Sequence, residues 1–285
     1  MMIVLTSRLG ESYGDSSSPE SPERLRNTYE LLARNKWVNM VLTERYASEQ
    51  DLLKVHSSDH LSRLKDSIQE DPDCPTYPEM YKYASLAAGI ALEAAKKTTE
   101  GNNSFSLMRP PGHHAAKGRS MGFCYINNAA LAAVFLRNQG ISKVAILDID
   151  NHHGNGTEEI VNGLEGILFV DLHKHPDYPG TGKSSHHNAI NFQLPNNIGE
   201  EGYLSVLDTA LTKITEFNPQ FLVVSIGFDT FEKDIIGGLG LKVSSYSRIG
   251  SRLRSLKIPS CSLMEGGYNL EALPKCVLSY ISSMQ

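Results

Sequence analysis

The chain has 285 residues, of which 40% are hydrophobic and 21% are charged, and its formal net charge at pH 7 is −5. These values are typical of a globular protein, and we expect one domain that spans residues 1–285. The negative charge argues against direct nucleic-acid binding through a general basic surface, and it is compatible with a cationic substrate.

We expect no targeting or membrane segment. The first residues lack the basic region and the long apolar run of a signal peptide, and no apolar run approaches the roughly 20 residues that a membrane helix needs. The widely spaced cysteines form no C-x-x-C pair, which is typical of reduced thiols. They are Cys74, Cys124, Cys261 and Cys276. The sequence therefore predicts a cytoplasmic protein that does not associate with membranes.

Short apolar runs alternate with helical patterns along most of the chain. In chain order, strands are predicted at 3–6, 104–108, 143–149, 167–172, 189–193, 221–226 and 259–264. Helices are predicted at 22–36, 78–97, 127–138, 200–217, 244–256 and 270–283. Continuous apolar runs such as KVAILDI are typical of strands that are buried on both faces of a parallel sheet. We therefore predict an α/β fold with a single-domain, doubly wound, mostly parallel sheet and helices on both faces.

Four of the predicted strands run directly into polar or glycine-rich segments. These segments carry His113 and His114, then Asp150 and His152, then Asp229, and finally Tyr268. Because ligands of open parallel sheets bind beyond the carboxyl ends of the strands, we expect these side chains to line one crevice.

The spacing of acidic residues and a histidine predicts a metal site. Asp148, Asp150 and His152 are spaced by two, so an extended strand end would point them to the same side. Asp150, His152 and the distant Asp229 would supply three ligands and leave an open position, as in a catalytic zinc site. The same ligand types would also accept iron, cobalt or manganese. Aspartates at a strand end can instead cap a helix or bind a phosphate-linked Mg²⁺, but the added histidines disfavour this alternative.

The other polar residues after these strands predict acid–base chemistry. A neutral imidazole from His113 or His114 beside a metal-bound water would be a natural general base. Tyr268 follows two glycines that allow close approach to a ligand, and its phenol could stabilise an oxyanion. A buried packing tyrosine would give the same pattern.

Two further histidine pairs lack additional ligands nearby in the sequence. His56 and His60 lie four residues apart on a predicted helix, and we expect a packing role for them. His186 and His187 lie in a polar loop, and we expect them to be solvated.

Taken together, these segments resemble the core blocks of the zinc-dependent histone deacetylase and acetylpolyamine amidohydrolase superfamily. The blocks, in family order, are RPPGHHA (109–115), GFCYINNAA (122–130), LDIDNHHGNGT (147–157), YPGTG (178–182), SIGFD (225–229) and MEGGYN (264–269). The resemblance covers almost the whole chain, and HHGNGT is similar to the class II branch. It implies the arginase-like α/β fold with a single divalent metal at the bottom of a narrow tunnel.

The resemblance also implies a role for each matching residue. It implies that Asp150, His152 and Asp229 bind one catalytic Zn²⁺. It implies catalytic roles for His114 as general base and proton donor, His113 as electrostatic partner, Asp148 and Asn155 as partners of these histidines, and Tyr268. It matches Phe123 and Tyr178 to the tunnel walls, Gly266 to the tunnel floor, and Asp73 to the rim carboxylate that binds substrate amides. It matches Asp148 and Asp171 to a structural K⁺ site, although the family often has Ser at the latter position.

The implied activity is hydrolysis of N-acetyl (acyl) lysine in proteins or peptides. Hydrolysis of an acetylpolyamine or another small N-acylamine is the alternative, although Ile236 replaces a glutamate that one polyamine-specific branch uses. An inactive binding module is disfavoured because every proposed ligand is retained. An arginase-like binuclear site is disfavoured because Thr230 and Phe231 leave a second metal without ligands. The acyl length, the physiological metal and the oligomeric state stay open.

Overall fold

Within residues 2–69 and 71–285, which the computed structural model describes, eight strands form one parallel sheet. The strands are β1 (Met2–Thr6), β2 (Asn39–Leu42), β3 (Asn103–Leu107), β4 (Val144–Asp148), β5 (Ile167–Lys174), β6 (Ala189–Leu194), β7 (Phe221–Ile226) and β8 (Ser260–Met264). Their order across the sheet is β2-β1-β3-β8-β7-β4-β5-β6, and neighbouring strands pair in parallel. The prediction of an α/β fold around a mostly parallel sheet is confirmed.

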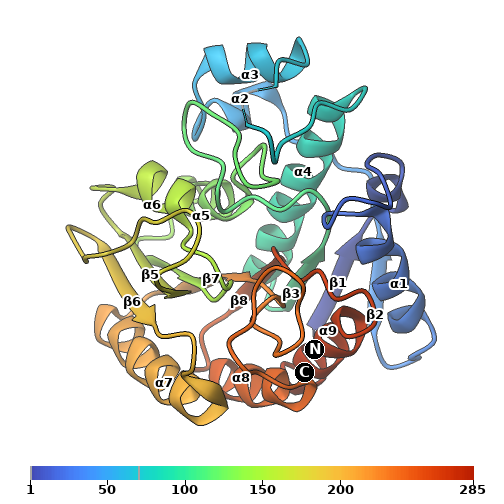
Figure 1. Cartoon of the computed structure of the whole chain (residues 1–285). Helices are drawn as coiled ribbons and strands as arrows, with labels where there is room; N and C mark the ends of the chain where they lie inside the picture. Colours follow the sequence, from blue (N-terminus) through green and yellow to red (C-terminus); the bar gives the residue numbers. More distant parts are fainter. Residues whose placement is uncertain (1, 70) are drawn as a thin grey trace.

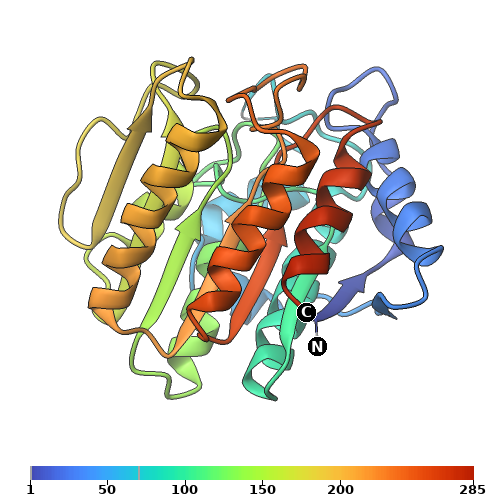
Figure 2. The same ribbon diagram turned by 90° about the horizontal axis from the view of Figure 1, so that it is seen from below.

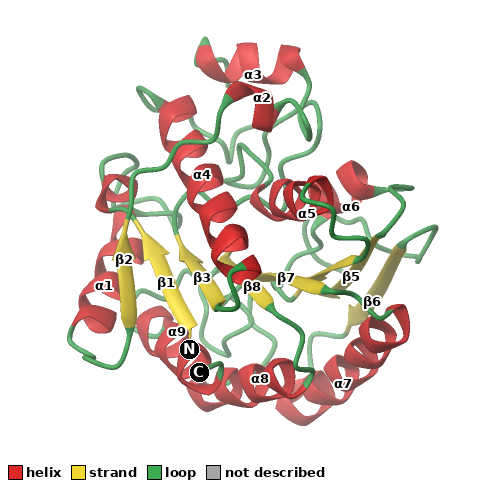
Figure 3. Cartoon of the chain, turned by 180° about the vertical axis from the view of Figure 1, so that it is seen from behind, coloured by secondary structure: helices red, strands yellow, loops and turns green. Residues whose placement is uncertain are grey.

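Helices cover both faces of this sheet (Figure 1). The α-helices are α1 (Pro22–Ala33), α2 (Glu49–Leu52), α3 (Ser58–Lys65), α4 (Met80–Thr99), α5 (Asn128–Asn138), α6 (Asn155–Val161), α7 (Gly199–Phe217), α8 (Val243–Ser255) and α9 (Leu273–Ser283). Figure 2 shows α7, α8 and α9 side by side across one face, and Figure 3 shows α4 and α5 on the opposite face. Among the described residues, none of these helices combines the length and apolar character needed to cross a bilayer.

Alternate residues of β4 face the two helical layers. Val144 and Ile146 belong to the core that α4 and α5 share, whereas Ala145 and Leu147 belong to the core beneath α7, α8 and α9. All four side chains are buried, as the continuous apolar run predicts. Complete burial of one large aliphatic side chain stabilises a fold by about 1.5–3 kcal/mol. The central strands are therefore rigid supports for the residues that follow them.

Local signals determine where several helices begin. Pro22 occupies the first turn of α1, as predicted. Asn127 caps α5, because its side chain accepts a hydrogen bond from the Ala130 N–H at 2.8 Å. Pro78, in contrast, lies before α4, which begins at Met80. The predicted start of that helix is therefore too early.

Four short elements were not predicted from the sequence, namely β2, α2, α6 and a 3₁₀ helix at Arg8–Glu11. β2 is an edge strand whose residues are partly exposed, so it lacks the continuous apolar run of the inner strands. α2 and α6 span four and seven residues, which is too short to show a helical period.

The four strands that precede the predicted site residues are neighbours in the sheet. Their order is β3-β8-β7-β4, in the middle of the sheet. Because these strands are parallel, their carboxyl ends lie at the same edge, where ligand sites of open α/β sheets are found.

Candidate active site

Three buried side-chain atoms that could bind a metal ion meet beyond the ends of β4 and β7. His152 Nδ1 lies 3.1 Å from Asp150 Oδ1 and 3.0 Å from Asp229 Oδ2. A tetrahedral zinc with bonds of about 2.0–2.1 Å has ligand atoms about 3.3 Å apart. The structure thus brings the three predicted ligands together at separations that suit one metal ion.

Backbone N–H groups orient the two carboxylates of this group. Gly266 N–H donates to Asp150 Oδ2 at 2.8 Å, and Asn151 N–H donates to Asp229 Oδ1 at 3.0 Å. Asp229 Oδ2 is buried without an aligned hydrogen-bond donor, although His152 Nδ1 is close. Burial, together with the Asp150 carboxylate, raises the pKa of Asp229. A bound cation would satisfy this unpartnered oxygen, so the residues fit a metal.

Gly266 leaves the space that the carboxylates occupy. A Cβ atom at Gly266 would lie 2.5 Å from Asp229 Oδ2 and 2.6 Å from Asp150 Oδ2. Glycine is therefore the residue that fits beside these two oxygens.

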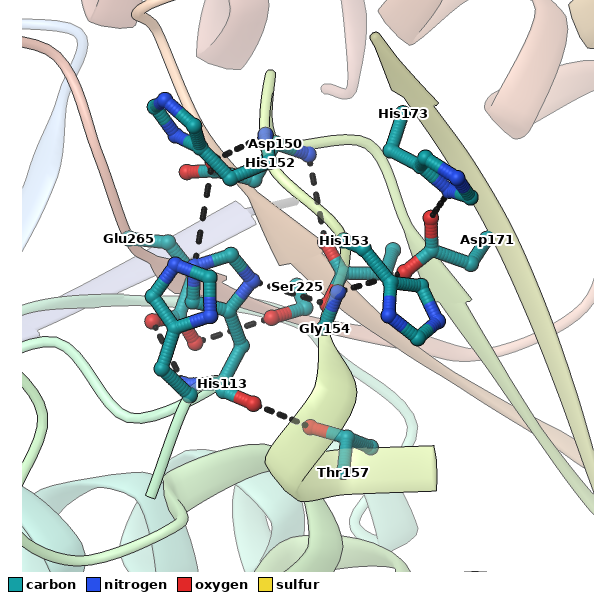
Figure 4. Close-up of polar contacts among 12 residues, drawn as sticks. His113, Asp150, His152, His153, Gly154, Thr157, Asp171, His173, Ser225 and Glu265 are labelled. Atoms are coloured by element: carbon teal, nitrogen blue, oxygen red, sulfur yellow. Dashed lines mark hydrogen bonds and ion pairs between the residues drawn. The ribbon is translucent and has the colours of Figure 1, made fainter. Parts of the chain in front are cut away.

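His113 lies next to the possible metal ligands, between two carboxylates (Figure 4). Its Nδ1 lies 3.3 Å from Asp148 Oδ2, and its Nε2 lies 3.7 Å from Asp150 Oδ1. Burial opposes a charge on this imidazole, but Asp150 and Asp148 outweigh burial and hold the pKa of His113 well above its usual value. The ring centroid of His114 is 3.9 Å away, so a positive charge lies directly beside the second histidine.

His114 is the neutral member of the pair. Its Nδ1 lies 2.7 Å from Asn155 Oδ1, and because an amide oxygen only accepts, Nδ1 carries the proton and Nε2 can take one up. Burial, followed by the positive charge of a protonated His113, lowers the pKa of His114 well below its usual value. A neutral imidazole with an available nitrogen is suited to general base catalysis.

Glu265 anchors the histidine segment, and it was not among the predicted site residues. Its Oε2 accepts hydrogen bonds from Gly112 N–H at 2.6 Å and His113 N–H at 3.1 Å. Its Oε1 accepts from Ser225 Oγ at 2.8 Å (Figure 4). The glutamate is part of the recognised segment MEGGYN, but the groups that it binds come from segments far away in the sequence, so its role could not be predicted.

A cavity of about 640 Å³ opens onto these groups. It is lined by His114, His152 and Tyr268, and by the predicted wall residues Phe123 and Tyr178. The Phe123 ring lies 5.7 Å from the Tyr268 ring, and the Tyr178 ring meets the His114 ring edge-on at 5.1 Å. The cavity is thus flanked by aromatic rings and reaches the proposed catalytic groups.

Three carboxylates line the same cavity, namely Asp15, Asp73 and Asp177, and no lysine or arginine does so among the described residues. Asp15 and Asp73 are exposed, so they lie where the cavity meets solvent. Asp73 was predicted as a rim residue, whereas Asp15 and Asp177 were not predicted. The opening of the cavity therefore favours positively charged molecules.

Tyr268 presents a protonated phenol to the cavity. Its side chain is buried, and the Arg24 guanidinium lies 4.8 Å from the centre of its ring. Burial raises the pKa of Tyr268 well above its usual value, although the Arg24 charge opposes this shift. The hydroxyl is therefore a hydrogen-bond donor at neutral pH.

Asp148 and Asp171 lie side by side on β4 and β5, where they pair in register. Both are completely buried. Burial raises the pKa of Asp148 even though His113 opposes the shift, and the Asp171 carboxylate adds to it. Two adjacent buried carboxylates fit the monovalent cation site that the resemblance implies.

A second buried group of possible metal ligands consists of His153, Asp171 and His173 (Figure 4). Here His173 Nδ1 lies only 2.7 Å from Asp171 Oδ1, which is a hydrogen-bond distance and is shorter than the separation of about 3.3 Å between zinc ligands. The two nitrogens of His153 contact Thr181 and Glu158 instead. This group is a hydrogen-bonded network.

The remaining histidine pairs agree with their predicted roles. His56 and His60 are buried, and Asn127 N–H donates to His56 Nε2 at 2.9 Å. Of this pair, only His60 lies on a helix, α3. His186 and His187 are exposed.

Sequence comparisons relate the chain to known deacetylases. A family model for the histone deacetylase domain matches residues 18–284. A probable deacetylase of Archaeoglobus fulgidus is 36% identical over 93% of this chain and 81% of its own length. Acetylpolyamine amidohydrolase 1 of Pseudomonas aeruginosa is 36% identical over 71% of this chain and 62% of its own length. Histone deacetylase 15 of Arabidopsis thaliana is 34% identical over 90% of this chain and 50% of its own length.

Solved structures show the same fold. The crystal structure of the HDA15 HD domain matches 99% of this chain and 90% of its own, with a TM-score of 0.92 and 30% identity. The acetylpolyamine aminohydrolase from Burkholderia pseudomallei matches 100% of this chain and 98% of its own, with a TM-score of 0.93 and 25% identity. These matches confirm the predicted deacetylase-like α/β fold.

Proposed function

The chain belongs to the histone deacetylase family, and from this premise we propose that it hydrolyses the amide of N-acetyl (acyl) lysine in proteins or peptides. That it is a hydrolytic deacetylase follows from the family and from its relatives. One observation carries the proposal: the buried group Asp150, His152 and Asp229 lies beside a cavity that also holds a neutral His114 and the Tyr268 phenol.

We assign one zinc ion to Asp150, His152 and Asp229. The buried oxygen of Asp229 that lacks a hydrogen-bond donor supports this assignment. When bound, zinc lowers the pKa of water toward about 7 and polarises a carbonyl group. Iron or cobalt would be accepted by the same ligand types. Gly266 leaves the floor of the site free for the two carboxylates.

The proton transfers are assigned to His114. Its Nε2 takes a proton from the attacking water and later gives it to the leaving amine, a role that typically contributes about 10²–10⁴-fold. Asn155 fixes the required tautomer by accepting from Nδ1. His113 lies beside Asp148, and its imidazole, when protonated, would stabilise negative charge that develops nearby. The Tyr268 hydroxyl donates a hydrogen bond to the oxyanion, and such a donor is typically worth about 10²–10³-fold.

The cavity determines how a substrate enters. Phe123 and Tyr178 provide aromatic walls for the aliphatic chain of an acyl-lysine, which is apolar up to its amide nitrogen. Asp73 is exposed at the opening, where its carboxylate can accept hydrogen bonds from substrate backbone N–H groups. We also assign a structural K⁺ to Asp148 and Asp171, whose buried carboxylates lie side by side.

An acetylpolyamine or another small N-acylamine is the second candidate substrate. Two observations favour it, namely the carboxylates of Asp15, Asp73 and Asp177 around the cavity and the similarity to an acetylpolyamine amidohydrolase. Ile236 also lines the cavity, so the charge that a glutamate would supply is absent at that position.

Turnover of the zinc-loaded protein on an acetyl-lysine peptide and on acetylated polyamines tests the proposal. Peptide cleavage that is lost in His114→Ala and strongly reduced in Tyr268→Phe is the expected result. A clear preference for the polyamines would move the substrate to the second candidate. Turnover of neither class by protein that holds one equivalent of zinc would overturn both.

A further inference from the structure

The Asp234 carboxylate joins the loop after β7 to the loop after β8. Its Oδ2 accepts hydrogen bonds from Tyr268 N–H at 2.7 Å and from Asn269 N–H at 3.1 Å. Its Oδ1 accepts from Ile236 N–H at 3.0 Å and from Gly237 N–H at 3.2 Å. One side chain therefore satisfies four backbone donors, two on each loop.

The peptide group that precedes Tyr268 is bound at both of its polar ends. Its carbonyl oxygen, on Gly267, accepts a hydrogen bond from Arg24 Nε at 2.7 Å. Its N–H, on Tyr268, is the group that donates to Asp234. Gly267 has a φ of 120°, a region that favours glycine. Because two charged side chains bind opposite ends of this peptide, its plane is fixed, and with it the direction in which the tyrosine side chain leaves the backbone.

The same contact ties Tyr268 to a metal ligand. Asp229 and Asp234 lie on the same loop after β7, and within it the Asp229 carbonyl oxygen accepts a hydrogen bond from Gly238 N–H at 2.7 Å. A further hydrogen bond between the two loops is donated by Asn269 Nδ2 to the Lys233 carbonyl oxygen at 2.8 Å. The loop that supplies a ligand is therefore also the loop that holds the phenol.

We propose that Asp234 is a positioning residue that sets the place of the Tyr268 hydroxyl relative to the metal ligands. The inference rests on the proposed function, in which this hydroxyl stabilises the oxyanion. Asp234 lies outside the set of residues that line the cavity, among those described, so it acts through the backbone of Tyr268. Oxyanion donors are effective only when they are aimed at the developing charge. Removal of the carboxylate should therefore lower turnover and leave substrate binding unchanged.

The test compares two substrates that need the phenol to different degrees, an acetyl-lysine peptide and its trifluoroacetyl analogue. The fluorines make the carbonyl more electrophilic, so that substrate depends less on an oxyanion donor. We expect Asp234→Ala to lower kcat for the acetyl peptide by about 10- to 100-fold and to leave KM within about twofold of the wild-type value. This loss of kcat approaches the loss that follows complete removal of an oxyanion donor. The trifluoroacetyl peptide should lose much less, so the ratio of the two rates should shift in the same direction as in Tyr268→Phe.

Two further variants separate positioning from general damage. Asp51→Ala is the matched control, because Asp51 also accepts a backbone N–H, from Ser48, but does so at the remote helix α2. It should leave the substrate ratio unchanged. The double variant Asp234→Ala/Tyr268→Phe should be no slower on the acetyl peptide than Tyr268→Phe alone, since the phenol that Asp234 positions is already gone.

Zinc content and thermal unfolding are measured for each variant. Where Asp234→Ala does not fold, Asp234→Asn keeps the shape of the side chain and offers one acceptor oxygen, while its NH₂ group opposes two backbone donors. We expect it to shift the substrate ratio by a smaller amount in the same direction. Equal losses on both substrates, or losses that add to those of Tyr268→Phe, would overturn the inference. A Tyr268→Phe protein as active as the wild type would instead overturn the role of the Tyr268 phenol in the proposed function.

Discussion

Gly266→Ala should weaken metal binding without preventing folding. The new Cβ would lie 2.5 Å from Asp229 Oδ2 and 2.6 Å from Asp150 Oδ2. These distances fall about 0.9 Å and 0.8 Å short of the 3.4 Å at which ordinary contact begins, so both carboxylates must move. Metal–ligand distances tolerate changes of only about 0.2 Å. Because altered support of metal ligands typically costs about 10- to 100-fold in affinity, we expect at least that loss of zinc affinity.

The assay is competition for zinc against a chromogenic chelator, with thermal unfolding of the metal-free protein as the folding control. Gly118→Ala is the matched variant, because a Cβ at Gly118 meets no atom within 4 Å, and its zinc affinity should equal that of the wild type. A Gly266→Ala protein that binds zinc within about twofold of the wild type would refute the assignment of the metal to Asp150 and Asp229.

Two predictions concern stability. Burial, together with the neighbouring His60, lowers the pKa of His56 from 6.5 to about 3, so between these values the unfolded chain binds a proton that the folded chain does not. The free energy of unfolding should therefore fall as the pH drops through this window, by up to about 1.4 kcal/mol per pH unit. In urea unfolding, His56→Gln should show a weaker pH dependence than the wild type. Wild-type and variant free energies that fall in parallel with pH would contradict this. Leu147→Ala truncates a fully buried side chain and should lower the free energy of unfolding by about 2–5 kcal/mol. A loss below about 1 kcal/mol in the same assay would contradict the packing of β4 described above.

Much of the fold could be predicted because the inner strands carry their own signal. Continuous apolar runs predicted β4 and β7, which are buried on both faces. β2 could not be predicted in this way, because it lies at the sheet edge and is only partly buried. The start of α4 was misplaced because a first-turn proline is only one of several ways to begin a helix.

The site residues that could be predicted are likewise those with a local sequence signal. Asp150 and His152 are close in sequence, and the strand pattern alone brings them to the same edge as Asp229. Glu265 and Asp234 act on backbone N–H groups of other loops, and nothing local in their own segments shows which N–H groups those are. Such contacts depend on the exact approach of two loops, which periodicity and motif spacing do not describe.

The adjacency of β8, β7 and β4 in the sheet has a consequence for protein synthesis. Asp150 and His152 leave the ribosome long before Asp229, and the Gly266 N–H that orients Asp150 follows later still. The strand β7 must pair with β4 before Asp229 can join the other two proposed ligands, and β8, which follows β7 in the chain, then brings the Gly266 N–H. Nascent chains that end before Asp229 therefore lack the third ligand of the proposed zinc site, which can form only once β7 has paired with β4.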